Sequence, residues 1–272
     1  WWQCCFWYGQ TVPAAAPPRQ RLFNGLLVGM YPLFFIGYTT VGTLAFDRPD
    51  TPLLPLPRIL TFMLNMILVG VAEELVFRGI IAQTLLERYG TARAGVWKAC
   101  LVSGVLFGAA HLSNLLGSAP FGVLMQCVFA ASLGVMLAAI YFRTGNLWVT
   151  VFLHSAMDIA AMLIGGLYGT TSVAESVSGY DASRLLSVAV YLIPTVFLLR
   201  KKKLPEVQLY WGGIVKKLRL ADKNLLAICR AIWYTVSVTV VRGWEYARFW
   251  ENRFPPLCHR QINYLKEVLY YE

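Results

Sequence analysis

The sequence predicts an all-α fold, a polytopic bundle of about six helices that crosses a membrane. Three observations predict it. Hydrophobic residues make up 57% of the 272 positions and charged residues only 14%, whereas a typical soluble domain is about 25% charged. Apolar runs near the length of about 20 residues that a membrane-spanning helix needs recur along the chain. Polar or proline-rich breaks separate these runs.

The breaks between the apolar runs define six predicted spans. The stretch DRPDTPLLPLPR contains four prolines and cannot be helical throughout. GSAP and RTGN resemble short turns, and GTTSVAESVSGYDAS reads as a polar loop. The predicted spans are Leu22–Phe46, Ile59–Leu86, Ala99–Leu116, Phe121–Phe142, Leu147–Tyr168 and Leu185–Leu199.

Basic residues give the predicted bundle an orientation. With six crossings, every strongly basic connection falls on one side, and the opposite loops are acidic, balanced or uncharged. Because cytoplasmic loops carry an excess of Lys and Arg, we expect both termini in the cytoplasm and the protein in the cytoplasmic membrane. The basic residues are Arg19, Arg21, Arg88, Arg93, Lys98, Arg143 and Arg200–Lys203.

Three parts of the chain differ in composition. Residues 1–18 read as an irregular lead-in, residues 19–203 as the membrane bundle, and residues 204–272 as a basic, aromatic-rich amphipathic tail that is cytoplasmic or interfacial. The net charge of +10 lies mainly in the predicted cytoplasmic loops and tail. Anionic lipid is therefore the expected partner of this charge, and no nucleic-acid-binding motif accompanies it.

Ionisable residues inside the predicted spans are candidates for function. A charge at mid-membrane costs about 2.5–3.5 kcal/mol on insertion scales. Such residues occur on three predicted helices, in the stretches EELVFR, FGAAH and HSAMD. Taken singly, each cluster is most simply a polar contact that holds helices together. Together, on three helices with little else polar, they predict a functional site.

Helical spacing divides the two adjacent glutamates between two roles. Glu73 and Glu74 point about 100° apart on a helix, so they cannot both face one small cavity head-on. Glu74 lies four residues before Arg78 and is its better partner. Glu73 is therefore the glutamate left for chemistry.

Glu73, His111, His154 and Asp158 admit two versions of hydrolysis by activated water. Two imidazoles and a carboxylate can hold a divalent ion such as zinc, whose bound water has a pKa near about 7. Without a metal, Glu73 can take a proton from water directly, while a histidine and a protonated Asp158 stabilise an oxyanion. Both versions fit a peptide bond in or near the membrane as substrate, and both stay open.

The three motifs resemble those of the CPBP intramembrane proteases, also called the Abi or CAAX-protease family, which are related to the Rce1-type prenyl-protein endopeptidases. The family motifs EExxxR, FxxxH and HxxxN or HxxxD occur here in the same order, and RTGNLWVTVFLHSAMD resembles the family's entry to the third motif. The resemblance covers roughly residues 56–169. The matching residues are Glu73, Glu74, Arg78, Phe107, His111, His154 and Asp158.

The resemblance implies an intramembrane endopeptidase and a role for each matching residue. Glu73 corresponds to the glutamate that activates water, and His111 to the histidine that works with it. His154 and Asp158 correspond to the pair that serves the oxyanion or binds a metal. Glu74, Arg78 and Phe107 correspond to residues that support the site or position the substrate. The implied substrate is a membrane-embedded or membrane-tethered peptide or protein.

Asp158 stands where some members of the family have Asn. An Asn side chain donates a hydrogen bond at any pH, whereas Asp donates only when it is protonated.

Two other classes of function use the same residues differently. A serine intramembrane protease would pair Ser132 with His154, but it leaves Glu73 and His111 without a role. A non-enzymatic membrane protein, such as a bacteriocin-immunity protein, a scaffold or a proton-coupled carrier, would use the same polar cluster without hydrolysis. A carrier more often shows broken helices or paired repeats, which the sequence does not show clearly.

Overall fold

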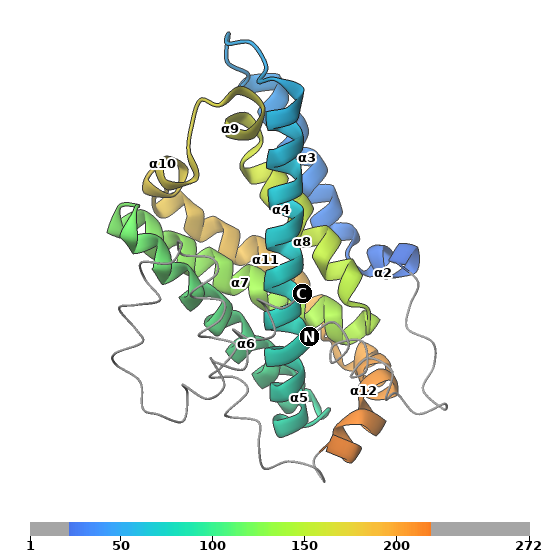
Figure 1. Ribbon diagram of the computed structural model, residues 1–272. Coiled ribbons are helices and arrows are strands. Elements are labelled where there is room, and N and C mark those ends of the chain that lie inside the picture. The colour runs from blue at the N-terminus through green and yellow to red at the C-terminus, as the bar shows by residue number, and fades with distance from the viewer. Residues whose placement is uncertain (1–21, 219–272) are drawn as a thin grey trace, which may run out of the picture. The chain divides into compact units, whose positions relative to one another are not determined.

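The computed structural model describes residues 22–218, and their regular structure is entirely helical (Figure 1). The all-α prediction is confirmed for this range. The predicted lead-in at residues 1–18 and the tail from residue 219 onward lie outside the described residues. The helices are α2 (Leu22–Val28), α3 (Met30–Phe46), α4 (Leu56–Val76), η1 (Phe77–Ala82), α5 (Gln83–Tyr89), α6 (Arg93–Ala110), η2 (His111–Leu116), α7 (Pro120–Thr144), α8 (Leu147–Ala161), α9 (Leu163–Tyr168), α10 (Val173–Ser178), η3 (Ala182–Leu185), α11 (Leu186–Leu198), η4 (Lys201–Lys203) and α12 (Leu204–Leu218).

Three continuous helical stretches of the described chain are long and apolar enough to cross a membrane: Leu56–Tyr89, Arg93–Leu116 and Pro120–Thr144. Two bent pairs raise the number to five if each pair is one span. The pair α2–α3 is bent by 81°, and the pair from Ala182 to Gly213 by 60°. The described residues thus support a helical membrane bundle, and the count of six spans stays a prediction.

The fifth predicted span, Leu147–Tyr168, consists of two helices in the structure. Helix α8 ends at Ala161 and α9 begins at Leu163, with Met162 between them. Helix α8 alone has 15 residues and is about 22 Å long, which is shorter than the hydrocarbon core of about 30 Å. The predicted fifth span is therefore not one continuous helix.

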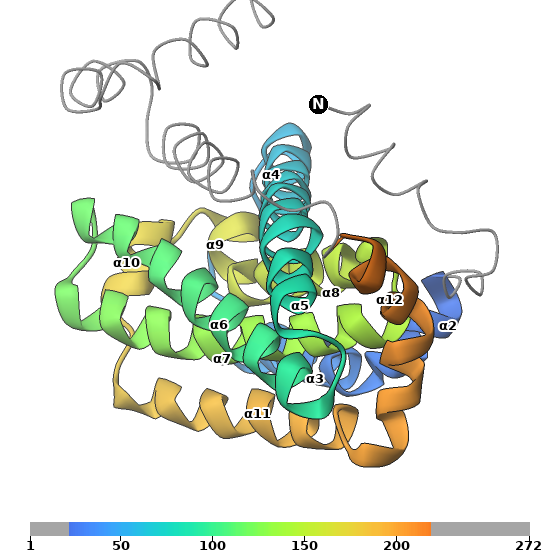
Figure 2. The same ribbon diagram turned by 90° about the horizontal axis from the view of Figure 1, so that it is seen from below.

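Helix α7 forms the centre of the described bundle. Its side chains are buried without interruption from Ser132 to Thr144, as expected of a helix that is apolar all round. Helices α6 and α11 pack alongside it, and α4 crosses it steeply (Figure 2). Helix α7 ends at Thr144 and is followed by Gly145. The side chain of Asn146 then accepts a hydrogen bond from the backbone amide of Trp148 at the start of α8. The predicted RTGN turn therefore connects α7 to α8 directly.

Helices α6 and α7 approach each other through glycines. A Cβ atom added to Gly134 of α7 would lie 2.9 Å from the Cα of Gly104 in α6 and 3.1 Å from the Phe107 ring. Gly104 and Gly108 form a small-xxx-small pattern of the kind that lets membrane helices pack closely. This close crossing brings the Gly134 carbonyl and the Phe107 ring to the same place, beneath the polar cluster.

Helix α4 begins earlier than the sequence predicted. Its first residue is Leu56, after Pro55, and Pro57 lies in its first turn. Proline is tolerated there because the first amides of a helix have no partner within the helix. The proline-rich break therefore passes into the helix three residues before the predicted start at Ile59.

Helix α12 continues the described bundle beyond residue 203. The indole of Trp211 donates a hydrogen bond to the Phe142 carbonyl at 2.9 Å, and Arg143 pairs with Glu206 at 2.7 Å. Its apolar side faces α7, so the start of the predicted amphipathic tail packs onto protein. The domain boundary at 203 stays a prediction. The buried side chains of α12 are Leu204, Val207, Trp211 and Val215.

We predict that Gly134→Ala lowers stability by about 1–3 kcal/mol, because an added methyl group in a tight crossing forces the helices apart. The measurement is thermal unfolding of the purified protein in detergent. Gly37→Ala is the matched control, since nothing lies within 4 Å of a Cβ there. Equal stability of the two variants would contradict the tight crossing.

Candidate active site

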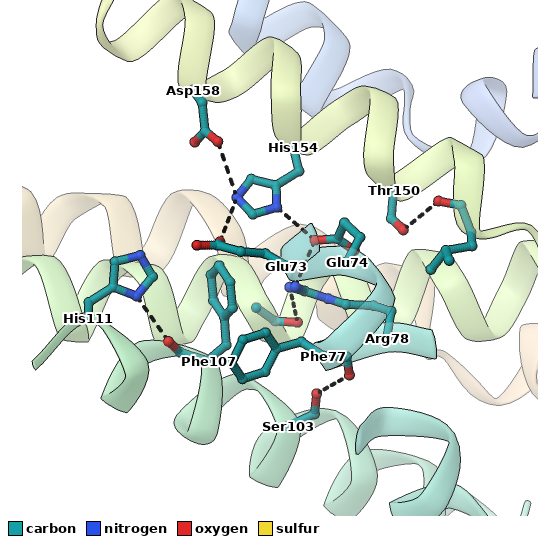
Figure 3. A network of polar contacts seen from close by, with 12 residues as sticks. Glu73, Glu74, Phe77, Arg78, Ser103, Phe107, His111, Thr150, His154 and Asp158 are labelled. Carbon is teal, nitrogen blue, oxygen red and sulfur yellow. Dashed lines mark hydrogen bonds and ion pairs between the residues drawn. The ribbon is translucent and has the colours of Figure 1, made fainter. Parts of the chain in front are cut away.

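Five of the residues singled out in the sequence converge where α4 packs along α8 (Figure 3). Glu73 and Glu74 end α4, and Arg78 follows in η1. His154 and Asp158 lie one turn apart on α8. The site thus joins two segments about 80 positions apart in the sequence.

Glu74 and Arg78 form a fully buried ion pair. Their side chains have no exposed surface, and Glu74 Oε1 lies 2.7 Å from Arg78 Nη1. Arg78 Nη2 also donates a hydrogen bond to the Gly134 carbonyl at 3.3 Å, and its guanidinium carbon lies 4.6 Å from the centre of the Phe107 ring. Arg78 therefore ties α4 to both α6 and α7, and the pairing expected from the four-residue spacing is present.

His154 connects the two glutamates through opposite edges of one ring. Its Nδ1 lies 2.8 Å from Glu74 Oε1. Because a paired carboxylate only accepts hydrogen bonds, Nδ1 carries the proton. Its Nε2 lies 3.6 Å from both Glu73 Oε2 and Asp158 Oδ2. Helical spacing predicts only the pairing of Glu74 with Arg78, and the structure adds this second contact.

The cluster has a partly exposed side and a fully buried side. The side chains of Glu73 and Asp158 are 20% and 29% exposed, whereas that of His154 is 4% exposed. Water or a substrate can therefore reach Glu73 and Asp158, while Glu74 and Arg78 stay covered. The covered Glu74 and the partly exposed Glu73 fit the arrangement that helical spacing predicted, and the role of Glu73 in chemistry stays a prediction.

His111 lies apart from the other polar residues, on the far side of the Phe107 ring. The ring centre of Phe107 is 5.1 Å from that of His111 and 5.5 Å from that of His154. His111 Nδ1 donates to the Phe107 carbonyl at 3.0 Å, which leaves its Nε2 free to accept. Within residues 22–218, no hydrogen bond or ion pair joins His111 to Glu73, His154 or Asp158.

A π-helical turn inside the first motif was not predicted. Residues Phe77–Ala82 form this turn between α4 and α5, and such turns are frequent at functional sites. The hydroxyl of Ser103, buried on α6, donates to the Phe77 carbonyl at 3.2 Å. Ser103 thereby satisfies a backbone oxygen at the start of the π-helical turn. The only sequence signal was a serine four residues before Phe107 in an apolar run.

Ser132 is placed poorly for a serine nucleophile. Its side chain is buried, and its hydroxyl donates to the Phe129 carbonyl of its own helix at 2.7 Å. This is the usual way in which a serine inside a membrane helix satisfies its hydroxyl. The structure gives it no contact with His154 among the described residues.

The proposed metal ligands do not form a ready coordination set. Among residues 22–218, no group of three or more His, Cys, Asp or Glu side chains is placed to hold a metal ion. His154 already uses Nδ1 for Glu74, and His111 lies behind Phe107. Zinc binding by His111, His154, Glu73 and Asp158 therefore stays a prediction, and we derive no step through a metal.

The apolar helices and the buried charge cluster define an integral membrane protein with a polar site between its helices. Residues 55–160 match the family described as type II CAAX prenyl endopeptidase Rce1-like. This match agrees with the family resemblance of the motifs and supports a membrane endopeptidase in general. All seven motif residues lie within it. No curated protein and no solved structure matches the chain significantly.

We predict that Arg78→Met destabilises the fold by about 3–5 kcal/mol, because it leaves the Glu74 carboxylate buried without its cation. Glu74→Gln combined with Arg78→Met should recover much of this loss, since Gln removes the charge and still accepts from His154. The measurement is the free energy of unfolding of both variants in detergent. A double variant that is as unstable as Arg78→Met would contradict the ion-pair reading.

Proposed function

We propose that the protein is an intramembrane endopeptidase that hydrolyses peptide bonds of membrane-associated substrates with water activated by Glu73. The observation that supports this most directly is the asymmetry of the two glutamates. Glu74 is fully buried between Arg78 and His154, whereas Glu73 is partly exposed beside His154 Nε2. A free carboxylate next to an imidazole is a suitable general base.

Hydrolysis by this site would begin with proton transfer from water to Glu73. The resulting hydroxide attacks the carbonyl carbon of the scissile bond, and the carbonyl electrons move to oxygen. A protonated Asp158 would donate a hydrogen bond to this oxyanion. Collapse of the intermediate breaks the C–N bond, and the proton held by Glu73 passes to the leaving nitrogen. No other reactant is needed.

His154 would lie between the reacting water and the partly exposed carboxylates of Glu73 and Asp158. Its Nδ1 is fixed on Glu74, so Nε2 points into the gap between Glu73 and Asp158. A distance of 3.6 Å to each is too long for a direct hydrogen bond, but a water can bridge it. The ring therefore supplies a fixed proton-exchange partner at the position where water would be activated.

His111 would contribute from the other side of the Phe107 ring. Its Nδ1 is held by the Phe107 carbonyl, and its Nε2 is left to accept a proton or a hydrogen bond. We assign it to orienting the substrate or the water in the occupied site. This role requires the substrate to lie across the Phe107 edge between the two histidines.

The family relationship favours a membrane-tethered peptide or protein as substrate, such as a CAAX-box protein. We also propose that anionic lipid lies against the basic segment that follows α11, where Arg200, Lys201 and Lys202 are exposed. With this segment in the cytoplasm, both termini would lie there too. The membrane would be the cytoplasmic membrane.

We predict that Glu73→Gln lowers kcat by about 10²–10⁴-fold, because the amide cannot act as a general base. The assay is cleavage of a membrane-tethered peptide library by purified protein in detergent, with thermal unfolding as the check on folding. His111→Ala should also reduce cleavage. Ser132→Ala is the control and should retain activity.

Full activity of Glu73→Gln with loss in Ser132→Ala would overturn the proposal in favour of a serine protease. If Glu73→Gln and His111→Ala preserve an immunity or transport phenotype and the wild type cleaves nothing, a non-enzymatic role is supported instead. A chelator added to the wild type addresses the metal. Activity that is lost with chelator and restored by zinc would require ligands to move together on substrate binding.

A further inference from the structure

A pocket of about 430 Å³ lies between the first half of α4 and the segment from α9 to α10. It is distinct from the polar cluster, and no motif residue lines it. Leu54 lines it, and the Leu54 backbone amide donates a hydrogen bond to the Leu167 carbonyl at 2.8 Å. The pocket is lined mostly by apolar side chains with a few polar groups, which is the usual character of a ligand site.

The pocket continues the face on which the candidate active site lies. Met66, in its wall, precedes Glu73 by about two turns of α4, or ~10 Å, and lies within ~20° of the same helix face. Met162, also in its wall, follows Asp158 by about one turn. On both helices, the pocket wall therefore lies one or two turns from a partly exposed carboxylate of the site.

The polar groups of the pocket are spread along its length, and Arg58 is the one on α4 farthest from Glu73. They are Arg58, Thr61 and Asn65 on α4, and Thr171. The Thr61 hydroxyl is already bonded to the Pro57 carbonyl. Within residues 22–218, the side chains of Arg58 and Asn65 are exposed and have no hydrogen-bond or ion-pair partner. An arginine and an amide with unpaired side chains in the wall of a mostly apolar pocket can bind an anionic oxygen group.

We propose that this pocket is a substrate subsite. Apolar side chains of the substrate occupy the pocket, and Arg58 pairs with a substrate carboxylate. The proposal rests on the proposed endopeptidase function and adds a determinant of specificity to it. Arg58 precedes Glu73 by about four turns of α4, or ~22 Å. An extended chain covers ~3.3 Å per residue. The carboxylate should therefore lie about five to seven residues from the scissile bond, with an apolar segment between.

The test uses the full chain in lipid nanodiscs and a set of membrane-anchored peptides with one fixed scissile bond. A single aspartate is moved along the peptide on both sides of the bond, with asparagine and lysine at the same positions as controls. We expect kcat/KM to rise about tenfold for aspartate in the window of five to seven residues on one side. The same window should show no gain with asparagine.

Charge reversal at Arg58 distinguishes recognition from a structural role. Arg58→Glu should lose the preference for aspartate and prefer lysine in the same window. Arg48→Glu is the matched control, because Arg48 is exposed in the loop that precedes α4 but does not line the pocket. Met66→Trp should reduce cleavage because the larger side chain fills the pocket. Leu64→Trp, at an exposed position of the same helix, should not.

Two further arms identify the source of the carboxylate and the competing partner. Peptides that end in the window with a free or an amidated C-terminus separate a terminal carboxylate from a side-chain carboxylate. Nanodiscs with and without anionic phosphatidylglycerol test a lipid headgroup. If Arg58→Gln changes cleavage of all peptides equally, and only with the anionic lipid, Arg58 binds lipid and the proposal is overturned.

The outcomes separate this proposal from the one on which it rests. Glu73-dependent cleavage that shows no position-dependent preference for aspartate overturns the subsite and leaves the endopeptidase intact. Cleavage of no peptide by the wild type, or equal cleavage by Glu73→Gln, removes the proposed function and the subsite with it. A preference for aspartate that survives Arg58→Glu also overturns the assignment of Arg58.

Discussion

The Glu74 carboxylate, shared by Arg78 and His154, is the interaction on which the rest of the site depends. Its Oε1 lies 2.7 Å from Arg78 Nη1 and 2.8 Å from His154 Nδ1. An unpaired charge at this depth would be costly in lipid, so all three groups must face one another between the helices. That requirement fixes the rotation of α4 against α8, and thereby fixes where Glu73 points.

The same pair also depends on close packing beneath it. Arg78 reaches the Gly134 carbonyl only because α6 and α7 cross closely at glycines. The Phe107 ring fills the space between that crossing and the two histidines, with ring centres 5.1 and 5.5 Å away. The glycines of this crossing and the Phe107 ring therefore help to determine where the charged side chains lie. The site is fully buried at Glu74 and Arg78 and partly exposed at Glu73 and Asp158.

The sequence predicted the parts of the site that follow from local helical spacing. Four-residue spacing placed Glu74 with Arg78, and the cost of charge in lipid pointed to the three motif helices. It could not predict that His154 turns Nδ1 toward Glu74, because that contact depends on the crossing of α4 and α8. The π-helical turn at Phe77 and the break at Met162 also have no strong local signal. Composition established the helical fold, whereas the number of spans depends on how bent pairs cross the membrane.

Because residue 158 is an aspartate and not an asparagine, the proposed reaction depends on which of the two carboxyl groups, Glu73 or Asp158, carries a proton. Glu73 and Asp158 both lie 3.6 Å from the same imidazole nitrogen. The proposed chemistry needs these two carboxylates in different protonation states. Ionised Glu73 can then serve as base while protonated Asp158 donates to the oxyanion. An Asn at this position would donate permanently, but it could not exchange the proton. With an aspartate at position 158, hydrogen bonding to the oxyanion in the proposed reaction depends on the protonation of Asp158 while Glu73 is ionised.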